Sequence, residues 1–443
     1  MTTEMVFEQR IPVRYEADVC VVGAGPAGCA AAVTAARSGA EVLLVEAWSM
    51  AGGMSTAARV PVFMVYSDGV RVLCGGFGEE VMERLRRQGA AKGFDGADII
   101  NAEHLKRVYE DLLEEAGVRW LYHARLGAVR GEGGRVDHGV FAGPGGLFAA
   151  KARIFVDATG DGSLAAWAGA PFEYGDPATG AVMPSTLCSV WAGFDWEAYR
   201  AAGAFGHDDE LMPKKLEQAF AAGRLSQEDY HLTGLYRISE TIALGNLSHE
   251  FGVDPRDEQS LTRGLVAGRR RLAEYEAFYR AEVAGFARAE IVESGSMLGV
   301  RESRRILGDY ILDFEDFMAR RTFPDEIGRY NFAADIHPSD YGWAAVAAHK
   351  KQHRETRMGP GESYGIPYRI LLPRGLDNVL ACGRCVSADR RVYSSLRAIP
   401  GCYITGQAAG MAAALCLENG RDPRALDTET LRERLKEKGA YFR

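Results

Sequence analysis

Three glycines near the N-terminus have a spacing that can hold phosphate groups. Gly23, Gly25 and Gly28 form G-x-G-x-x-G between an apolar run that predicts a strand, residues 17–22, and an alanine-rich run that predicts a helix, residues 29–38. The first glycine permits a tight turn, the second lets the backbone approach a pyrophosphate, and the third lets the helix pack on the strand. Free N–H groups and the positive end of the helix dipole would face the phosphates. The pattern therefore predicts a dinucleotide-binding unit.

An acidic residue follows at the position that such a unit requires. Residues 41–45 predict a second strand, and Glu46 ends it, close to the offset of roughly 20 residues at which an acid bonds a ribose hydroxyl. A carboxylate there would repel a 2′-phosphate. The unit is therefore expected to bind FAD or NAD rather than NADP.

A second group with chemical potential is rich in arginine. Arg301, Arg304 and Arg305 lie at i, i+3 and i+4, a spacing that places side chains on one face of a helix. Such a face can hold a substrate carboxylate with paired hydrogen bonds. The alternative is that these arginines form ion pairs with acids such as Glu302 and Asp309. We take Arg301 and Arg304 as candidate catalytic residues.

The histidines offer one candidate for proton transfer and one spacing that suits a metal. His337 is the candidate for proton transfer, because the pKa of a free imidazole, about 6.5, suits that work. His349 and His353 have the i, i+4 spacing of metal ligands, but no glutamate lies between them and no third ligand is evident. We therefore expect a solvated basic helix face there, and no metal.

Two further motifs have a structural and a chemical interpretation. Cys382 and Cys385 have the C-x-x-C spacing of a redox dithiol, but they do not precede a thioredoxin-like helix, so we expect a structural role. Tyr368 and Tyr393 suit either the wall of a substrate site or the core.

Length and composition limit the class of protein. A chain of 443 residues favours two domains, and 47% hydrophobic with 25% charged residues is ordinary for a globular protein. A net charge of −8 disfavours nucleic acid as a partner. The first 15 residues have no apolar signal core, and the low-charge runs 19–36 and 398–417 contain glycine and proline, so we expect no targeting peptide and no membrane span. Scattered cysteines favour a cytoplasmic protein with reduced thiols.

The order of the predicted elements indicates a discontinuous first domain. A helix with apolar residues from Leu105 to Leu113, a small β-meander over 125–150 and a long helix over 260–289 are expected. Near residue 376 the sequence again shows the pattern of the first domain, with a predicted strand at 378–381 and a predicted helix at 403–418. We therefore predict a first domain at 1–170, an inserted domain at 171–368, a return at 369–425 and a C-terminal helix at 426–443.

Several separate segments together resemble one family. The chain resembles the bacterial FAD-dependent oxidoreductases, which have a glutathione-reductase type of Rossmann fold and are distantly similar to the fumarate reductase and succinate dehydrogenase flavoproteins. The resembling segments are 22–28, 52–56, 156–161, 299–306, 364–368, 381–384 and 401–414. The fold class implied is α/β, a Rossmann-like FAD-binding domain with an inserted α+β substrate domain.

The resemblance also implies which residues would hold FAD. Gly23, Gly25, Ala27 and Gly28 would cradle the pyrophosphate, and Glu46 would hold the adenosine ribose. The remaining implied contacts are Gly52, Gly53 and Thr56 at the ribityl or isoalloxazine part, Ala158, Thr159, Gly160 and Asp161 at the adenosine side, and Gly383, Arg384 and Gly406 at the pyrimidine edge of the flavin. Relatives that bind FAD covalently use a histidine near the second glycine motif. Residues 52–62 contain none, so we expect non-covalent FAD.

The expected function is hydride transfer between flavin N5 and a carbon of a small organic substrate, which would bind between the two domains. No second G-x-G-x-x-G opens a helix, so no separate NAD(P)H domain is expected, and a small acceptor or a redox protein would complete the electron path. The alternatives are a flavin-dependent monooxygenase and a non-enzymatic FAD-binding sensor or scaffold.

Overall fold

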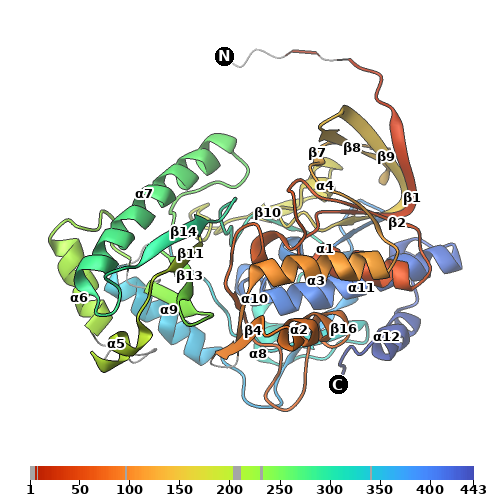
Figure 1. Ribbon diagram of the computed structural model, residues 1–443. Helices are drawn as coiled ribbons and strands as arrows, with labels where there is room; N and C mark the ends of the chain where they lie inside the picture. The colour runs from red at the N-terminus through yellow and green to blue at the C-terminus, as the bar shows by residue number, and fades with distance from the viewer. Residues whose placement is uncertain (1–4, 7, 95–96, 203–210, 230–232, 340–341) are drawn as a thin grey trace.

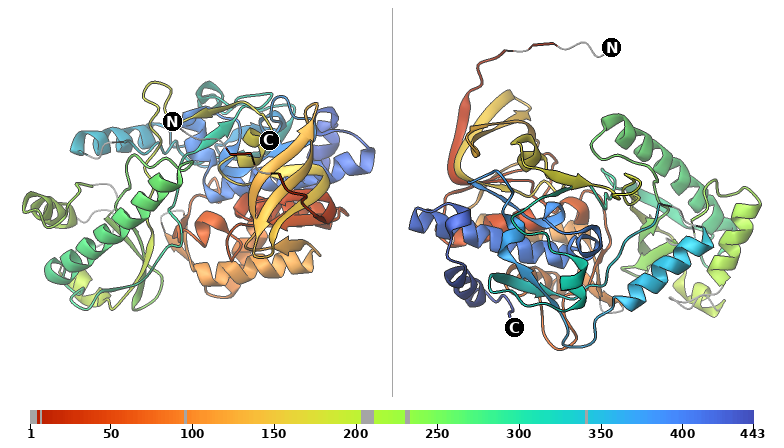
Figure 2. Two further views of the ribbon diagram at one scale, coloured as in Figure 1. Left: turned by 90° about the horizontal axis from the view of Figure 1, so that it is seen from above. Right: turned by 180° about the vertical axis from the view of Figure 1, so that it is seen from behind.

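The computed structural model describes residues 5–6, 8–94, 97–202, 211–229, 233–339 and 342–443, and it has two units with separate cores (Figures 1 and 2). The first unit is built on a seven-stranded sheet and contains both ends of the described chain. The second unit is built on a four-stranded sheet and occupies the opposite side of the molecule in Figure 1.

The centre of the first unit is a parallel sheet. Its strands β1 (Val13–Val22), β2 (Val42–Val45) and β9 (Gly146–Asp157) pair in the order β2-β1-β9. Strands β6 (Arg119–Leu121) and β18 (Val379–Ala381) extend it at β2 and β9. Side chains from both faces of β1 are buried in different core clusters, which explains its uninterrupted apolar sequence. The predicted β-α-β unit is confirmed.

Strand β9 also belongs to an antiparallel meander. Its first half pairs with β8 (Arg135–Gly143), which pairs with β7 (Arg125–Glu132). The meander predicted over 125–150 is present. The second half of β9 then runs parallel to β1 and ends at Asp157, beside the loop that follows β1.

Two helices cover one face of this sheet in close contact. Helix α1 (Pro26–Arg37) follows the glycine turn, and helix α11 (Ile399–Asn419) crosses it. A Cβ atom at Gly410 would lie 2.2 Å from the carbonyl oxygen of Ala31, so only glycine permits this separation. The helix predicted near 403–418 therefore contacts α1 through a glycine.

The second unit has its own core of aromatic side chains. Strands β11 (Ser189–Ala192), β12 (Thr233–Arg237), β13 (Ile242–Leu247) and β14 (Glu290–Ser294) pair antiparallel in the order β12-β13-β11-β14. Helix α7 (Glu258–Glu282) packs on this sheet, and it ends earlier than the predicted 289. Helices α5 (Trp196–Ala201) and α6 (Leu211–Ala221) complete the unit.

The chain returns to the first core earlier than the sequence indicates. Apolar residues from Leu312 to Leu372 share a core with α1 and α11, whereas the second core takes residues from Leu187 to Val300. The boundaries at 170, 368 and 425 stay predictions, and the packing favours a return near residue 300. None of the helices that the structure describes has the length and apolar character needed to cross a bilayer.

The remaining elements are short or lie at the periphery. They are η1 (Gly53–Ser55), β3 (Val62–Phe63), α2 (Phe77–Arg87), β4 (Ala91–Phe94), β5 (Ala97–Ile100), α3 (Ala102–Glu115), α4 (Ser163–Trp167), β10 (Phe172–Tyr174), β15 (Arg304–Ile306), α8 (Phe314–Met318), β16 (Glu326–Tyr330), α9 (Trp343–Glu355), β17 (Tyr364–Pro367), η3 (Tyr368–Leu371), η4 (Gly383–Cys385), α10 (Arg390–Leu396), η5 (Pro423–Ala425) and α12 (Thr428–Glu437).

Candidate active site

The three glycines of the first turn differ in what surrounds them. A Cβ atom at Gly28 would lie 1.8 Å from the carbonyl oxygen of Gly23, and Gly23 itself has a φ of +97°. Both are therefore required by the protein fold. A Cβ atom at Gly25 would meet no described atom within 4 Å. Gly25 precedes Pro26 at the first turn of α1, where helix N–H groups have no intrahelical acceptor. The turn thus has an open side that suits a phosphate group.

Glu46 connects the end of β2 to this turn. Its carboxylate accepts hydrogen bonds from the backbone N–H of Ala24 at 2.7 Å and from that of Trp48 at 2.9 Å. Burial raises the pKa of Glu46, and the backbone N–H groups act in the opposite direction. The acid lies where the dinucleotide pattern requires it, and it also fixes the conformation of the glycine turn.

The loop after β9 lies next to the same turn. The buried carboxylate of Asp157 accepts hydrogen bonds from the Thr159 backbone N–H at 3.0 Å and from its hydroxyl at 2.8 Å. Ala158 packs against Gly23. Arg384 forms an ion pair with Asp161 at 2.8 Å. The structure therefore brings the implied adenosine-side residues together with Arg384.

Two of the implied FAD residues have structural tasks that the sequence did not reveal. The Thr56 hydroxyl donates to the Ala51 carbonyl at 2.6 Å and is buried, so it shapes the loop that carries Gly52. A Cβ atom at Gly406 would lie 2.2 Å from the carbonyl oxygen of Ala27. Gly406 therefore permits helix contact, and its place at the flavin edge stays a prediction. Gly53, in contrast, lies directly beside Gly25.

The arginine segment is not a helix, which corrects the expected shared face. Residues 301–303 are irregular, and Arg304 and Arg305 lie on β15, where successive side chains point to opposite faces. Arg304 donates to the Asp161 carbonyl oxygen at 3.1 Å, toward the predicted FAD loop. Arg304 therefore does not share a site with Arg301.

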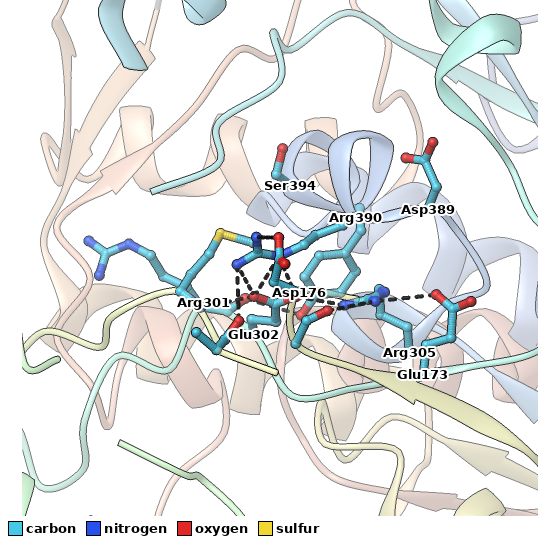
Figure 3. A network of polar contacts seen from close by, with 12 residues as sticks. Glu173, Asp176, Arg301, Glu302, Arg305, Asp389, Arg390 and Ser394 are labelled. Carbon is cyan, nitrogen blue, oxygen red and sulfur yellow. Dashed lines mark hydrogen bonds and ion pairs between the residues drawn. The ribbon is translucent and has the colours of Figure 1, made fainter. Parts of the chain in front are cut away.

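Arg305 belongs to a buried ionic network, as the structural alternative for this segment expected. The carboxylate of Glu302 accepts hydrogen bonds from Arg305 at 2.6 Å and from Arg390 at 3.0 Å. Arg390 also pairs with Asp176 at 2.9 Å. Figure 3 shows these groups converging on Glu302, whereas the Arg301 side chain extends away from them. The network joins β15, α10 and the loop after β10.

Arg301 instead lies where the two units meet. Its guanidinium donates to the Pro184 carbonyl oxygen at 2.7 Å and to the Thr186 hydroxyl at 2.8 Å. Burial raises the pKa of Cys188 and that of Tyr236, and it lowers the pKa of His249. At each of these three groups the positive charge of Arg301 acts to lower the pKa.

The predicted flavin loop reaches the same junction. The backbone N–H of Ser296 donates to the Ala57 carbonyl at 2.9 Å, and Arg59 pairs with Glu103 at 2.8 Å and also with Glu293. Arg59 and Ser248 each have a φ of +60°, an uncommon conformation for residues with a side chain. Strained backbone of this kind is concentrated at functional sites.

A chain of buried histidines and carboxylates crosses the junction. His249 contacts Asp229 through Nδ1 at 2.7 Å and His337 through Nε2 at 3.2 Å. His337 Nε2 lies 3.2 Å from the Asp335 carboxylate, and so does Nε2 of His349. Burial lowers the pKa of His249 to about 4, although Asp229 acts in the opposite direction, so this imidazole is neutral near pH 7.

The cluster corrects one expectation and leaves another open. His349 does not lie on a solvated face, because its side chain is 6% exposed and faces Asp335. His353, one turn later on α9, lies half-buried against Phe332. The proton-transfer role of His337 stays a prediction. The cluster draws on α9, the segment after β13 and two further loops, so no local sequence pattern could have revealed it.

The remaining candidates are structural. Cys382 and Cys385 are buried free thiols, and burial raises the pKa of both, which disfavours the reactive thiolate. The Tyr368 hydroxyl donates to Pro423, and that of Tyr393 donates to the Arg301 carbonyl. Both tyrosines are therefore core residues, and Tyr393 also holds the backbone of Arg301.

Comparison with known proteins gives one family. The family model described as FAD dependent oxidoreductase matches residues 18–435. A search of the curated proteins gives no match to this chain.

The solved structures that match this chain are distant in sequence. A geranylgeranyl bacteriochlorophyll reductase-like protein from Thermoplasma acidophilum is 12% identical, with 96% of this chain and 84% of that chain covered and a TM-score of 0.45. The myxobacterial chondrochloren halogenase is 13% identical, with 95% and 78% covered and a TM-score of 0.48. The p-nitrophenol 4-monooxygenase of Pseudomonas putida DLL-E4 is 11% identical, with 95% and 83% covered and a TM-score of 0.46.

Proposed function

The chain belongs to the FAD dependent oxidoreductase family, and we propose that this FAD-dependent enzyme transfers a hydride between flavin N5 and a carbon of a small organic substrate. The open side of Gly25, the carboxylate of Glu46 and the first turn of α1 fit a dinucleotide. When bound, FAD supplies the two-electron chemistry. We further propose that FAD is held without a covalent bond.

The observation that carries the proposal is the convergence at the junction of the two units. The loop after η1, the segment 295–301 and Thr186, which forms a β-bridge with Gly299, meet there, and Arg301 supplies a positive charge. An arginine held by a carbonyl and a hydroxyl is pre-organised, so less conformational entropy is lost when it binds a ligand. We infer that Arg301 orients an anionic or carbonyl oxygen of the substrate.

Arg301 and Arg304 have different roles in this proposal. Arg301 would act on substrate, whereas Arg304 would support the loop that carries Asp161. The ionic network at Glu302 would hold the backbone between them. A small electron acceptor or a redox protein would complete the cycle, because the chain carries only one dinucleotide fingerprint.

The proposal is tested by anaerobic mixing of the purified flavoprotein with a panel of small hydroxy, amino and unsaturated acids. We expect at least one compound to bleach the flavin absorbance without oxygen, or to reoxidise the chemically reduced protein. A protein that consumes substrate only in the presence of reductant and oxygen, and inserts oxygen into it, would instead be a monooxygenase, and the hydride-transfer proposal would be wrong.

A further inference from the structure

We propose that Asp335, His337 and His349 form a site for a divalent first-row transition-metal ion, such as Zn²⁺ or Fe²⁺, beside the junction of the two units. Among the described residues, these are three side chains whose donor atoms all lie within 4.8 Å of one another. Two imidazoles and one carboxylate are a donor set that binds such ions and leaves positions open for a ligand.

The distances between the donor atoms suit an ion. Nε2 of His337 and Nε2 of His349 each lie 3.2 Å from an oxygen of Asp335. An ion roughly 2.1 Å from each donor requires separations of roughly 3–3.5 Å between donors. The two rings also approach each other, with centroids 5.2 Å apart. His337 faces one carboxylate oxygen of Asp335 and His349 faces the other, and the donor atoms of the three residues all lie within 4.8 Å of one another.

The surroundings of His337 provide a second, independent argument. His249 joins Asp229 to His337, because its Nδ1 lies 2.7 Å from the Asp229 carboxylate and its Nε2 lies 3.2 Å from Nδ1 of His337. Nδ1 of His337 is therefore engaged by the histidine behind it, and Nε2 of His337 faces Asp335. A carboxylate–histidine relay behind a ligand is the usual support of a metal-binding imidazole.

Nearby positive charges restrict the kind of ion. Arg397 donates to the Asp335 carboxylate at 3.0 Å and to the Asp335 carbonyl oxygen at 3.2 Å. The hydrogen bond from Arg397 to the carbonyl oxygen of Asp335 can persist when the Asp335 carboxylate binds an ion. Arg397 and Arg301 disfavour weakly held cations such as Mg²⁺, which prefer oxygen donors. An ion held strongly by imidazole nitrogen is therefore required, and its open positions would attract an anionic ligand.

The site lies beside the predicted flavin end of the first unit. The backbone N–H of Asp335 donates to Ser394 on α10 at 2.8 Å, and Arg397 directly precedes the start of α11. The metal site itself is independent of the proposed function. A role of the bound ion in holding a substrate oxygen would rest on the proposed function.

The test measures metal content of the FAD-bound protein directly. Wild-type protein is incubated with Zn²⁺, or anaerobically with Fe²⁺, desalted, and analysed by inductively coupled plasma mass spectrometry, with X-ray absorption at the metal edge. We expect about one ion per chain, with nitrogen and oxygen donors at ~2.0–2.1 Å. Mg²⁺ alone should not be retained.

Single-residue variants show which side chains bind the metal ion. His349→Ala and Asp335→Ala should lose the ion, whereas His353→Ala, one turn further along α9, should keep it. His249→Ala should weaken metal affinity roughly 10–100-fold, as loss of an outer partner does. FAD absorbance and thermal unfolding verify that each variant is folded. Folded, FAD-bound wild type that retains no Zn²⁺ or Fe²⁺, or a His349→Ala variant that binds as wild type does, would overturn the proposal. Metal binding without flavin reduction by any substrate would sink only the proposed function.

Discussion

At the scale of single residues, the glycine turn separates the needs of the fold from the needs of a ligand. Gly23 and Gly28 are surrounded by protein atoms, whereas the space beside Gly25 contains no described atom. The sequence pattern assigns different tasks to these glycines. The structure supports that division residue by residue.

Gly25→Val should abolish FAD retention while the protein stays folded. The side chain would occupy the space proposed for the pyrophosphate, and its Cβ would meet no described protein atom within 4 Å. Gly28→Val is the matched control, and it should unfold or aggregate because its Cβ would overlap the Gly23 carbonyl. Flavin absorbance after gel filtration and circular dichroism measure the two effects. Normal FAD content in Gly25→Val would show that this turn does not hold the phosphates.

Arg301→Ala should slow anaerobic flavin reduction by roughly 10²-fold or more, the scale for loss of one charge-stabilising donor. FAD content should stay normal, because Arg301 contacts the second unit rather than the glycine turn. Lysine should restore only part of the rate, since an ammonium lacks the planar fork.

The exposed Arg269 on α7 provides the control for loss of a positive charge. The flavin of the Arg269→Ala variant should be reduced as fast as that of the wild type. Stopped-flow rates are compared with thermal unfolding for each variant. An Arg301→Ala protein that is less stable but reduces at the normal rate would assign the residue a structural role alone.

At the scale of elements, the site depends on a close helix crossing. Gly410→Ala should destabilise the protein by at least about 1–3 kcal/mol, because the added methyl group would lie 2.2 Å from the Ala31 carbonyl oxygen and force α1 and α11 apart. FAD affinity should fall as well, since α1 carries the glycine turn. Denaturant unfolding measures the free energy. Gly93→Ala, at an exposed position with open space among the described residues, should show little change.

Glu302→Ala should destabilise the protein by about 3–5 kcal/mol, the effect of removing one partner from a buried ionic network. Both Arg305 and Arg390 would lose their shared partner. Glu115→Ala breaks an exposed pair with Arg84 and should change the free energy of unfolding by less than about 1 kcal/mol. Equal unfolding midpoints for the two variants would contradict the assigned importance of the network.

Elements with a strong local signal were predictable, and those set by distant contacts were not. The turn after β1 and helix α3 follow from glycine spacing and from apolar residues at helical intervals. Residues 301–305 have a helical spacing of arginines, but pairing with β10 makes 304–306 a strand. Tertiary pairing outweighed the local pattern there.

At the scale of the whole molecule, the junction between the two units could not be derived from the sequence. His249 is far from His337 and His349 in the sequence, and only tertiary packing brings the three histidines together. The i, i+4 histidine pair suggested a solvated face because its partner Asp335 is remote in sequence. The cytoplasmic location stays a prediction.

The most direct measurement of the central claim is anaerobic stopped-flow reduction with a substrate that carries deuterium at the reacting carbon. If a hydride passes between that carbon and flavin N5, the flavin absorbance should bleach without oxygen and the deuterated substrate should react several-fold more slowly. Deuterium should then leave the substrate. Bleaching that occurs at the same rate with both isotopologues when the chemical step limits, or turnover that requires oxygen, would contradict the account.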